Sequence, residues 1–305
     1  MMRNIAVLLF LCFFCLPAGA TSSSVTPRYP VVLVHGFIGF DQLFGIVPYW
    51  FGIAKELERS GVEVYVAQVS AVNSSEIRGD QLIEQIEHFL QQTGASKANI
   101  IGHSQGGLSA RYVAAERPDL VASVTTVGAP HKGSELGDFV RRLTGGDQTL
   151  RAGFVHVTVG LLGRLIDLSS TGGYPQDGKA ALSSLTAVGL EDFNRRYPQA
   201  VPEDCGEGAY EVDGIRYYSW GGVRNWTTVV DPSDVILWLT GLVFEEENDG
   251  LVGRCSNHLG MVIRDDYPHN HIDEINQILG LDGFGPFEPS EIYLEHVARL
   301  REAGL

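Results

Sequence analysis

Basic side chains are scarce in this chain of 305 residues. Lysine and arginine number 22 against 37 aspartates and glutamates, which gives a formal net charge of -15. A nucleic-acid-binding surface needs clustered cations to neutralise phosphates, and this balance repels a phosphate backbone instead. The composition therefore argues against nucleic acid as a partner.

Internal repeats and low-complexity tracts are also missing. The 36 glycines imply many turns, but they form no triplet repeat of the collagen kind. Only 19% of the residues are charged and 44% are hydrophobic, a composition that can bury a full core and excludes extended disorder. We expect a single globular α/β domain, or two at most, in a chain of this length.

Long apolar runs are limited to the amino terminus. Arg3 is followed by an apolar stretch at residues 5–16, then by Pro17 and three small residues, the layout of a cleavable secretory signal. This stretch is shorter than the roughly 20 residues that cross a bilayer. We therefore expect a signal peptide at residues 1–20 and a mature domain at residues 21–305 that is secreted through the periplasm and has no transmembrane segment.

Cysteine is rare as well. Of the four cysteines, Cys12 and Cys15 lie in the predicted signal, which leaves Cys205 and Cys255 in a chain bound for an oxidising compartment. We predict one disulfide bond between them. Since no CxxC motif or Cys/His cluster remains, the sequence offers no zinc site.

Apolar segments alternate between strand-like and helix-like patterns over the first 130 residues. Continuous apolar or β-branched runs predict strands at residues 29–34, 62–69, 99–101 and 121–127, and helical periodicity predicts helices at residues 50–60, 78–92 and 107–116. This alternation predicts a doubly wound, mostly parallel sheet with helices on both faces.

Residues from about 134 to 190 break this rhythm. They include a helical apolar stretch at residues 155–168, with a glycine pair on each side of it. We interpret the segment as a helical insertion, or lid, over the sheet. Apolar residues on both faces of the helix fit a buried helix and a mobile lid equally well.

The pentapeptide Gly102-x-Ser104-x-Gly106 lies between a predicted strand and a predicted helix. In that context the motif forms a nucleophile elbow, a tight turn that exposes the serine hydroxyl at the start of the helix. Ser104 is therefore the candidate nucleophile. A tetrahedral intermediate also needs hydrogen-bond donors, and the backbone amides of Phe37, which follows the first strand, and of Gln105 are the candidates for this oxyanion hole.

A hydroxyl is a weak nucleophile without a base, so an acid and then a histidine must follow Ser104. Four of the later histidines are poor candidates, because they come too early, lie beside a cysteine or lie in a polar terminal helix: His131, His156, His258 and His296. His269 and His271 remain, just before a predicted helix at residues 272–279. Composition does not separate these two.

Three aspartates compete for the role of the acid. Asp249 follows an apolar run at residues 239–244 that we expect to form a strand, so it is the favoured acid. Asp231 and Asp234 have the pattern of helix caps. An ordinary turn at Asn248-Asp249-Gly250 is the alternative reading for Asp249.

Longer stretches resemble one known family. They are YPVVLVHGFIGFDQLFG, NIIGHSQGG, VGAPHKGS, CGEGAY, DPSD, NDGLVG and NHIDEINQILGL. Together they resemble the true lipases of Gram-negative bacteria related to the Pseudomonas and Burkholderia enzymes, over nearly all of residues 29–281. The resemblance implies an α/β-hydrolase fold and triacylglycerol lipase activity, with Ser104, Asp249 and His271 as the triad and the amides of Phe37 and Gln105 as the oxyanion hole.

The resemblance also implies a structural Ca²⁺ ion. Asp231 and Asp273 match its carboxylate ligands, and Gln277 and Leu281 match positions that supply carbonyl oxygens. Without the resemblance, Asp231 would be a cap and Asp273 a surface charge. Cys205 and Cys255 match the family disulfide. Because the tail lacks Gly/Asp nonapeptide repeats, the resemblance points to relatives that need a membrane-bound foldase chaperone.

Other activities share the same serine chemistry. The expected substrate is a lipid ester at an oil–water interface, but a carboxylesterase, a phospholipase or an acyltransferase would use the same triad with another pocket. A non-catalytic binding protein is the alternative from a different class, and the retention of all three triad residues argues against it. The chain also departs from many family members, which have histidine where it has Gln105.

Overall fold

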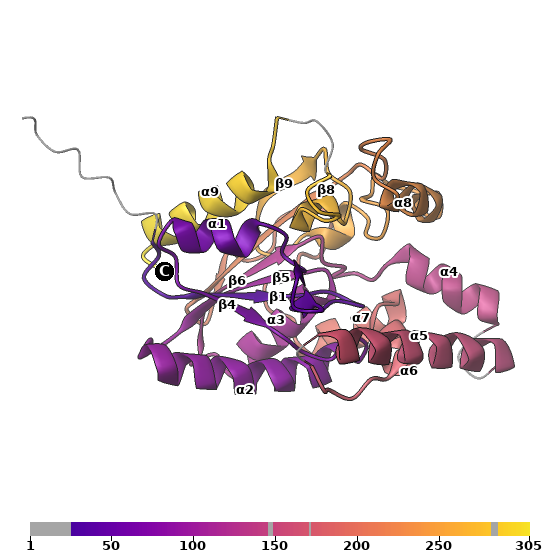
Figure 1. Cartoon of the computed structure of the whole chain (residues 1–305), viewed down its shortest axis with the longest axis horizontal. Helices are drawn as coiled ribbons and strands as arrows, with labels where there is room; N and C mark the ends of the chain where they lie inside the picture. The colour runs from indigo at the N-terminus through magenta and orange to yellow at the C-terminus, as the bar shows by residue number, and fades with distance from the viewer. Residues whose placement is uncertain (1–25, 146–148, 171, 282–285) are drawn as a thin grey trace, which may run out of the picture.

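A seven-stranded, mostly parallel sheet forms the centre of the protein in a computed structural model that describes residues 26–145, 149–170, 172–281 and 286–305 (Figure 1). The predicted signal at residues 1–20 lies outside the described residues. The strand order is β4-β1-β5-β6-β8-β7, with β9 on β8, and only β7 is antiparallel to its neighbour. The strands are β1 (Val31–Val34), β4 (Val64–Ala67), β5 (Ala98–His103), β6 (Val121–Val127), β7 (Glu211–Val212), β8 (Ile215–Gly222) and β9 (Met261–Tyr267).

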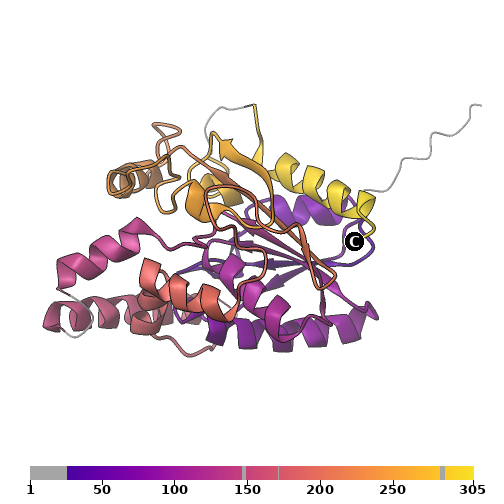
Figure 2. The same ribbon diagram turned by 180° about the vertical axis from the view of Figure 1, so that it is seen from behind.

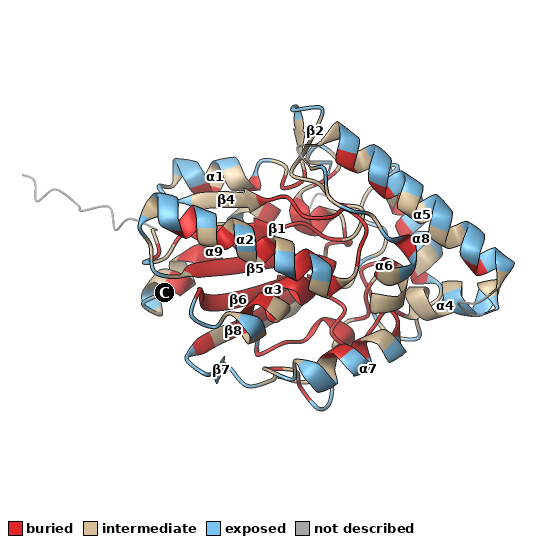
Figure 3. Cartoon of the chain, turned by 90° about the horizontal axis from the view of Figure 1, so that it is seen from below, coloured by how far each residue is buried: buried red, intermediate tan, exposed pale blue. Residues whose placement is uncertain are grey.

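Helices cover both faces of this sheet. Figures 1 and 2 show α1 (Ile53–Arg59) and α9 (Pro289–Glu302) on one face and α2 (Ser75–Thr93) and α3 (Gln105–Glu116) on the other. The central strands β1, β5 and β6 are buried along their whole length, as Figure 3 shows. This double cover is why these strands are continuously apolar instead of alternating. The predicted α/β architecture is confirmed.

The predicted helices and strands up to β6 are all present, within a few residues of their expected ends. Local chemistry sets those ends: the Ser74 hydroxyl caps α2 by accepting a hydrogen bond from the Ile77 amide, and Gly94 ends the helix at a φ of 74°. A left-handed backbone conformation at this position favours glycine. A two-stranded hairpin, β2 (Gln42–Leu43) and β3 (Val47–Pro48), precedes α1.

Three helices lie within the segment that we interpret as an insertion, and a fourth begins in it and ends beyond residue 190. They are α4 (Glu135–Thr144), α5 (Leu150–Ser169), α6 (Gly178–Ser184) and α7 (Ala187–Arg196), and Figure 1 shows them beyond one end of the sheet. The α5 and α6 backbones pack closely, since a Cβ atom on Gly178 would lie 2.1 Å from the His156 carbonyl oxygen. A larger residue at position 178 would separate the two helices.

The α5 helix presents an apolar stripe to solvent, and Figure 3 shows most of the helix as exposed. The exposed side chains recur every three or four residues: Leu150, Phe154, Val157, Leu161, Leu165 and Leu168. This helix is also long and apolar enough to cross a membrane, although only 17% of its most apolar stretch is buried inside the protein. The expectation that no segment after the amino terminus is long and apolar enough to cross a membrane was therefore wrong. Glycine and arginine residues interrupt the apolar run in the sequence, but the mean hydropathy of the whole helix is still high.

Two local predictions fail. Residues 239–244 do not form a strand; they are the end of α8 (Ser233–Gly241) and a turn in which the Val243 amide donates to the Thr240 carbonyl. Residues 272–279 form only a short 3₁₀ turn, η2 (Asp273–Ile275). Ile272, Ile275 and Ile278 line a cavity, whereas Leu239 and Leu242 are exposed on and just after α8.

The terminal helix α9 is not polar throughout. Its inner face is buried, and His296 on that face is hydrogen-bonded to the Thr125 hydroxyl at 2.8 Å. Cys205 and Cys255 form a disulfide bond in the structure, as predicted. This bond ties the loop before β7 to the short 3₁₀ turn η1 (Cys255–Asn257).

Candidate active site

Ser104 lies in a strained turn between β5 and α3. Its φ of 54° and ψ of -129° are unusual for a residue with a side chain. The turn depends on close backbone contacts, because a Cβ atom on Gly102 would lie 2.4 Å from the Gly106 oxygen and one on Gly106 would lie 2.3 Å from the Val34 oxygen. Glycine at both positions therefore permits the elbow that the motif predicts.

His271 and Asp249 are hydrogen-bonded to each other in a buried site. The His271 Nδ1 atom lies 2.7 Å from Asp249 Oδ2, and the His271 amide donates to the Asp249 carbonyl. The other carboxylate oxygen of Asp249 accepts hydrogen bonds from the Leu251 and Val252 amides. These bonds fix the carboxylate, so Asp249 can hold the imidazole of His271 in one tautomer.

His269 has different partners. Its Nε2 atom is hydrogen-bonded to the Phe287 carbonyl, and its ring stacks on Tyr267. The structure therefore pairs Asp249 with His271 and directs His269 elsewhere, so geometry separates the two histidines that composition could not.

Ser104 and His271 line the same cavity, which has a volume of about 600 Å³. No hydrogen bond joins the Ser104 hydroxyl to His271 in the described part of the chain; such bonds are often loose before substrate binds. The walls are mainly apolar side chains from the loop after β1, from the insertion and from the segments after α8 and β9: Phe37, Ile38, Phe40, Leu136, Val140, Leu182, Leu185, Leu251, Val252, Ile272, Ile275 and Ile278.

The amides of Phe37 and Gln105 have no acceptor among the described residues. The Gln105 amide is at the start of α3, where an amide has no partner within its own helix. The Gln105 side chain is buried and donates to the Asn73 carbonyl and to the Ser184 hydroxyl of α6. Both backbone amides are thus available to an oxyanion, while the side chain of Gln105 has a separate structural contact.

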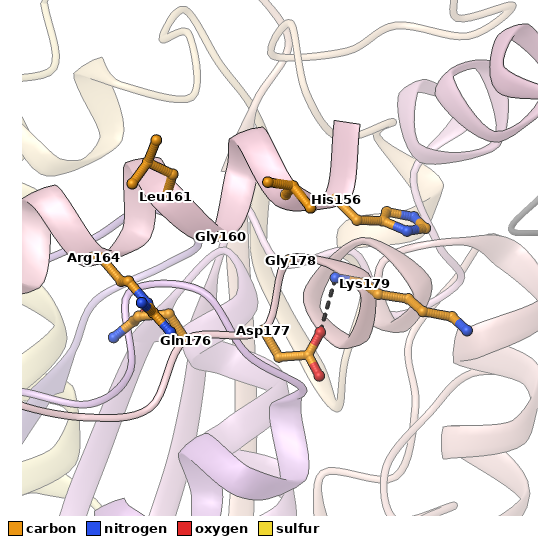
Figure 4. A pocket seen from close by; sticks show the side chains of 9 residues that line it. His156, Gly160, Leu161, Arg164, Gln176, Asp177, Gly178 and Lys179 are labelled. Atoms are coloured by element: carbon orange, nitrogen blue, oxygen red, sulfur yellow. Dashed lines mark hydrogen bonds between the residues drawn. The ribbon is translucent and has the colours of Figure 1, made fainter. Parts of the chain in front are cut away.

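A second cleft, of about 420 Å³, opens between α5 and the segment before α6 (Figure 4). Its lining includes His156, Arg164 and Lys179, and Figure 4 shows the Asp177 carboxylate hydrogen-bonded to the Lys179 amide. The side chains of Arg164 and Lys179 extend in different directions, and no serine, threonine or cysteine is among the residues that line this cleft. The chemistry therefore belongs to the larger, apolar cavity.

Three buried groups around the triad were missed by sequence reasoning: His103, Tyr49 and Glu274. The Glu274 carboxylate accepts a hydrogen bond from the Gly222 amide, and burial together with the Asp249 charge raises its pKa well above the usual range. Burial and the neighbouring His271 lower the pKa of His103 well below its usual value. His103 could have been suspected from its place inside the Ser104 motif, whereas nothing in the sequence distinguishes Tyr49 or Glu274.

The ligand atoms of His103, His271 and Glu274 lie within 4.8 Å of one another and could hold a metal ion. Two imidazoles and one carboxylate are not the all-oxygen set that Ca²⁺ prefers. One of these imidazoles is also hydrogen-bonded to Asp249. This cluster is therefore distinct from the predicted calcium ligands.

Asp231 and Asp273, the predicted carboxylate ligands, are both buried, and each has one carboxylate oxygen without a hydrogen-bond partner. Burial, with the charges of Asp234 and Asp231, raises the pKa of Asp273 to about 7. None of the salt bridges among the described residues gives these aspartates a lysine or arginine partner. Unpaired buried carboxylate oxygens are costly, so this donor set fits a hard cation.

Gln277 and Leu281 lie near the same turn. The Gln277 side chain donates to the Tyr49 carbonyl, and the Leu281 amide donates to the Ile278 carbonyl. In the part of the chain that the structure describes, neither the Gln277 nor the Leu281 carbonyl accepts a hydrogen bond. Both carbonyl oxygens are thus free to serve as ligands, as the resemblance implies.

Comparison with known proteins agrees with this geometry. The family model described as alpha/beta hydrolase fold matches residues 29–275. A triacylglycerol lipase from Vibrio cholerae is 54% identical over 91% of this chain and 89% of its own length, and one from Burkholderia plantarii is 41% identical over 94% and 90%. The crystal structure of Staphylococcus hyicus lipase has a TM-score of 0.61 at 18% identity, covering 91% of this chain and 97% of that chain, a likeness of fold alone.

We predict that Gly106→Ala destabilises the protein. The new methyl group would lie 2.3 Å from the Val34 oxygen and 2.6 Å from the His35 oxygen, which are backbone atoms that cannot move aside cheaply. We expect the free energy of unfolding to fall by about 3 kcal/mol or more, measured by urea denaturation. Gly153→Ala is the matched control, because its Cβ atom meets nothing within 4 Å. Equal stability of the two variants would contradict the packing argument.

Proposed function

Since the chain belongs to the α/β-hydrolase fold family and, within it, to the bacterial triacylglycerol lipases, we propose that it is a secreted lipase that cleaves glycerol esters through an acyl-enzyme. Membership of this family makes the protein a serine ester hydrolase. The observation that carries the finer proposal is the buried His271–Asp249 pair, whose histidine lines one apolar cavity with Ser104.

In the first half of the reaction, the Ser104 hydroxyl attacks the ester carbonyl carbon. The Nε2 atom of His271 accepts the hydroxyl proton, and Asp249 stabilises the imidazolium that forms. The amides of Phe37 and Gln105 donate hydrogen bonds to the oxyanion of the tetrahedral intermediate. When this intermediate collapses, the bond to the leaving oxygen breaks, His271 returns the proton to that oxygen, and the glycerol alcohol leaves.

In the second half, water replaces the alcohol. His271 takes a proton from the water as it attacks the acyl carbon, and the same two amides bind the second oxyanion. Cleavage of the bond to Ser104 releases the fatty acid, and His271 returns the proton to the Ser104 oxygen. The enzyme is then restored with no group gained or lost.

The shape and polarity of the cavity support a lipid substrate. Its walls are largely apolar, and a buried apolar wall suits an acyl chain better than a charged substrate. The exposed apolar stripe of α5 belongs to the same insertion as α4 and α6, and both of these helices line the cavity. A helix with an apolar outer face and flanking arginines lies favourably in a lipid surface, so we infer that α5 contacts the oil–water interface instead of crossing a membrane.

A carboxylesterase, phospholipase or acyltransferase would share this chemistry. The similarity to relatives named triacylglycerol lipase supports glycerol esters as the substrate of this chain. The exposed apolar helix supports an aggregated substrate over a soluble one. We therefore rank triacylglycerol hydrolysis above these alternatives, and above a binding protein without activity.

We propose that one Ca²⁺ ion supports the site. Asp231 and Asp273 would hold it with the carbonyl oxygens of Gln277 and Leu281. The ion would neutralise carboxylates that are otherwise buried without cations. Because Asp273 is two residues beyond His271, binding would also fix the loop that carries the base.

Secretion and a membrane-bound foldase chaperone complete the proposal. The disulfide between Cys205 and Cys255 supports an oxidising destination, which fits the signal-like residues 1–20. The foldase rests on the resemblance to relatives that lack nonapeptide repeats.

The main test compares substrates and removes the nucleophile. The purified mature protein should hydrolyse emulsified long-chain triglycerides faster than soluble short-chain esters or phospholipid vesicles. Ser104→Ala should lower kcat by about 10⁴-fold or more on every one of these substrates, because no other hydroxyl takes its place. Undiminished hydrolysis by Ser104→Ala would refute the mechanism, and a clear preference for phospholipid would refute the substrate assignment.

Asp249→Asn should inactivate the enzyme without unfolding it. Because Oδ1 accepts two amide hydrogen bonds, the asparagine carbonyl will keep that position and its NH₂ group will face His271 Nδ1. The proton of the neutral imidazole then moves to Nε2, which can no longer take the serine proton. We expect kcat to fall roughly 10³–10⁴-fold while the melting temperature changes little. Retention of more than a tenth of kcat would contradict the role of Asp249.

Removal of calcium should destabilise the protein. EGTA should lower the melting temperature by about 5 °C or more, because the ion binds only the folded state. Asp273→Asn should lower the melting temperature in calcium and abolish the response to EGTA. Glu58→Gln, which changes an exposed carboxylate on α1, is the matched control and should respond like the unmodified protein. A melting temperature that EGTA leaves unchanged would rule out the ion.

A further inference from the structure

A chain of hydrogen bonds runs behind Ser104 from the loop of Phe37 to the loop of His271. The Gly36 amide donates to the Tyr49 hydroxyl at 3.0 Å, and this hydroxyl lies 2.7 Å from His103 Nδ1. On the other side of the same ring, His103 Nε2 lies 3.0 Å from the His271 carbonyl oxygen. Tyr49 and His103 are both buried, so water does not compete for these contacts.

The direction of each bond in this chain is fixed. The His271 carbonyl can only accept, so the single ring proton of neutral His103 is on Nε2 and is donated to that carbonyl. Nδ1 then has a free lone pair that accepts the Tyr49 hydroxyl proton, and the same hydroxyl oxygen accepts from the Gly36 amide. Burial keeps the pKa of His103 well below its usual value, in agreement with a neutral ring.

Position 36 has room only for glycine, and a glycine backbone needs other contacts to hold it in one conformation. A Cβ atom on Gly36 would lie 2.7 Å from the Ser104 Cβ atom and 2.9 Å from the Tyr49 hydroxyl. Glycine is the residue whose backbone is least restricted. The Gly36 carbonyl is bound within its own loop, by the Gly39 amide, whereas its amide is bound to Tyr49 from outside that loop. The Gly36 carbonyl shares a peptide plane with the Phe37 amide, so Gly39 and the His35 ring, which lies 3.0 Å from this carbonyl, hold that plane directly. Tyr49 holds the plane before it, through the Gly36 amide, and so anchors the start of the loop that carries the Phe37 amide.

We propose that Tyr49 and His103 are positioning residues that hold the Phe37 amide and the His271 loop in register around Ser104. The inference rests on the proposed function, since it assigns the geometry of that site to two residues that perform no step of the reaction. Their effect is on the transition state, because the oxyanion donors and the base act together only when the tetrahedral intermediate forms.

Tyr49→Phe tests the proposal, because it removes one oxygen and keeps the ring. We expect kcat on soluble p-nitrophenyl butyrate to fall about 10- to 100-fold, with KM within about twofold of its original value. Inhibition by a boronic acid, which forms a tetrahedral adduct on the serine, should weaken in parallel. Tyr218→Phe is the matched control: it removes a buried hydroxyl whose partner is Tyr210, and kcat should be unchanged.

A double-mutant cycle separates positioning from general packing. His103→Leu removes both ring contacts, whereas His103→Gln keeps a donor toward the His271 carbonyl and should retain more of kcat. Adding Tyr49→Phe to either variant should lower kcat less than it does alone, because the chain is already broken. If His103→Leu does not fold, the cycle with His103→Gln decides the question.

The possible outcomes are distinct. Full kcat in Tyr49→Phe, multiplicative losses in the cycle, or a loss confined to KM would each overturn the positioning role. If the unmodified protein hydrolyses no ester, the proposed function itself fails. If it is active and Ser104→Ala is not, while Tyr49→Phe matches the unmodified protein, only the positioning role fails.

Discussion

Close backbone packing around Ser104 is the constraint on which the rest of the structure depends. Gly102, Gly106 and Gly36 each occupy a place where a methyl group would overlap a neighbouring atom. These contacts bring the end of β5, the start of α3 and the loop after β1 to the same point. The strained conformation of Ser104 persists because the buried sheet on one side and the helix on the other leave it no alternative.

Several acidic side chains are buried close to this site. Asp231, Asp234, Asp249, Asp273 and Glu274 are all at most 2% exposed. Amides and hydroxyls satisfy some of their oxygens, as the Thr227 and Thr228 amides do for Asp234, but others have no partner among the described residues. Burying so many carboxylates beside the base is costly without a cation or a raised pKa, and burial raises the pKa of both Asp273 and Glu274.

Much of this fold was accessible from the sequence, because the strands of a doubly covered sheet are continuously apolar and glycine marks the sharp turns. Residues 121–127 were predicted as a strand with its observed bounds. Residues 239–244 and 272–279 were predicted wrongly, because a short apolar run resembles a strand or a helix on composition alone. The first run has Leu239 and Leu242 exposed at the end of a helix, and the second lines a cavity. Glu274 and Tyr49 could not be predicted as neighbours of the site, because they approach it through tertiary contacts between residues far apart in the chain.

Gln105 shows how the insertion is connected to the chemistry. Its amide is a candidate oxyanion donor, while its buried side chain donates to the Ser184 hydroxyl at the end of α6 and to the Asn73 carbonyl before α2. The segment between α5 and α6 is bound to the same loop, since the Asn73 side chain and the Ser70 hydroxyl both donate to the Pro175 carbonyl. One glutamine thus joins the start of α3, the loop before α2 and α6. A histidine at this position has a shorter reach and a single ring proton when neutral, so it could not donate to both oxygens at once.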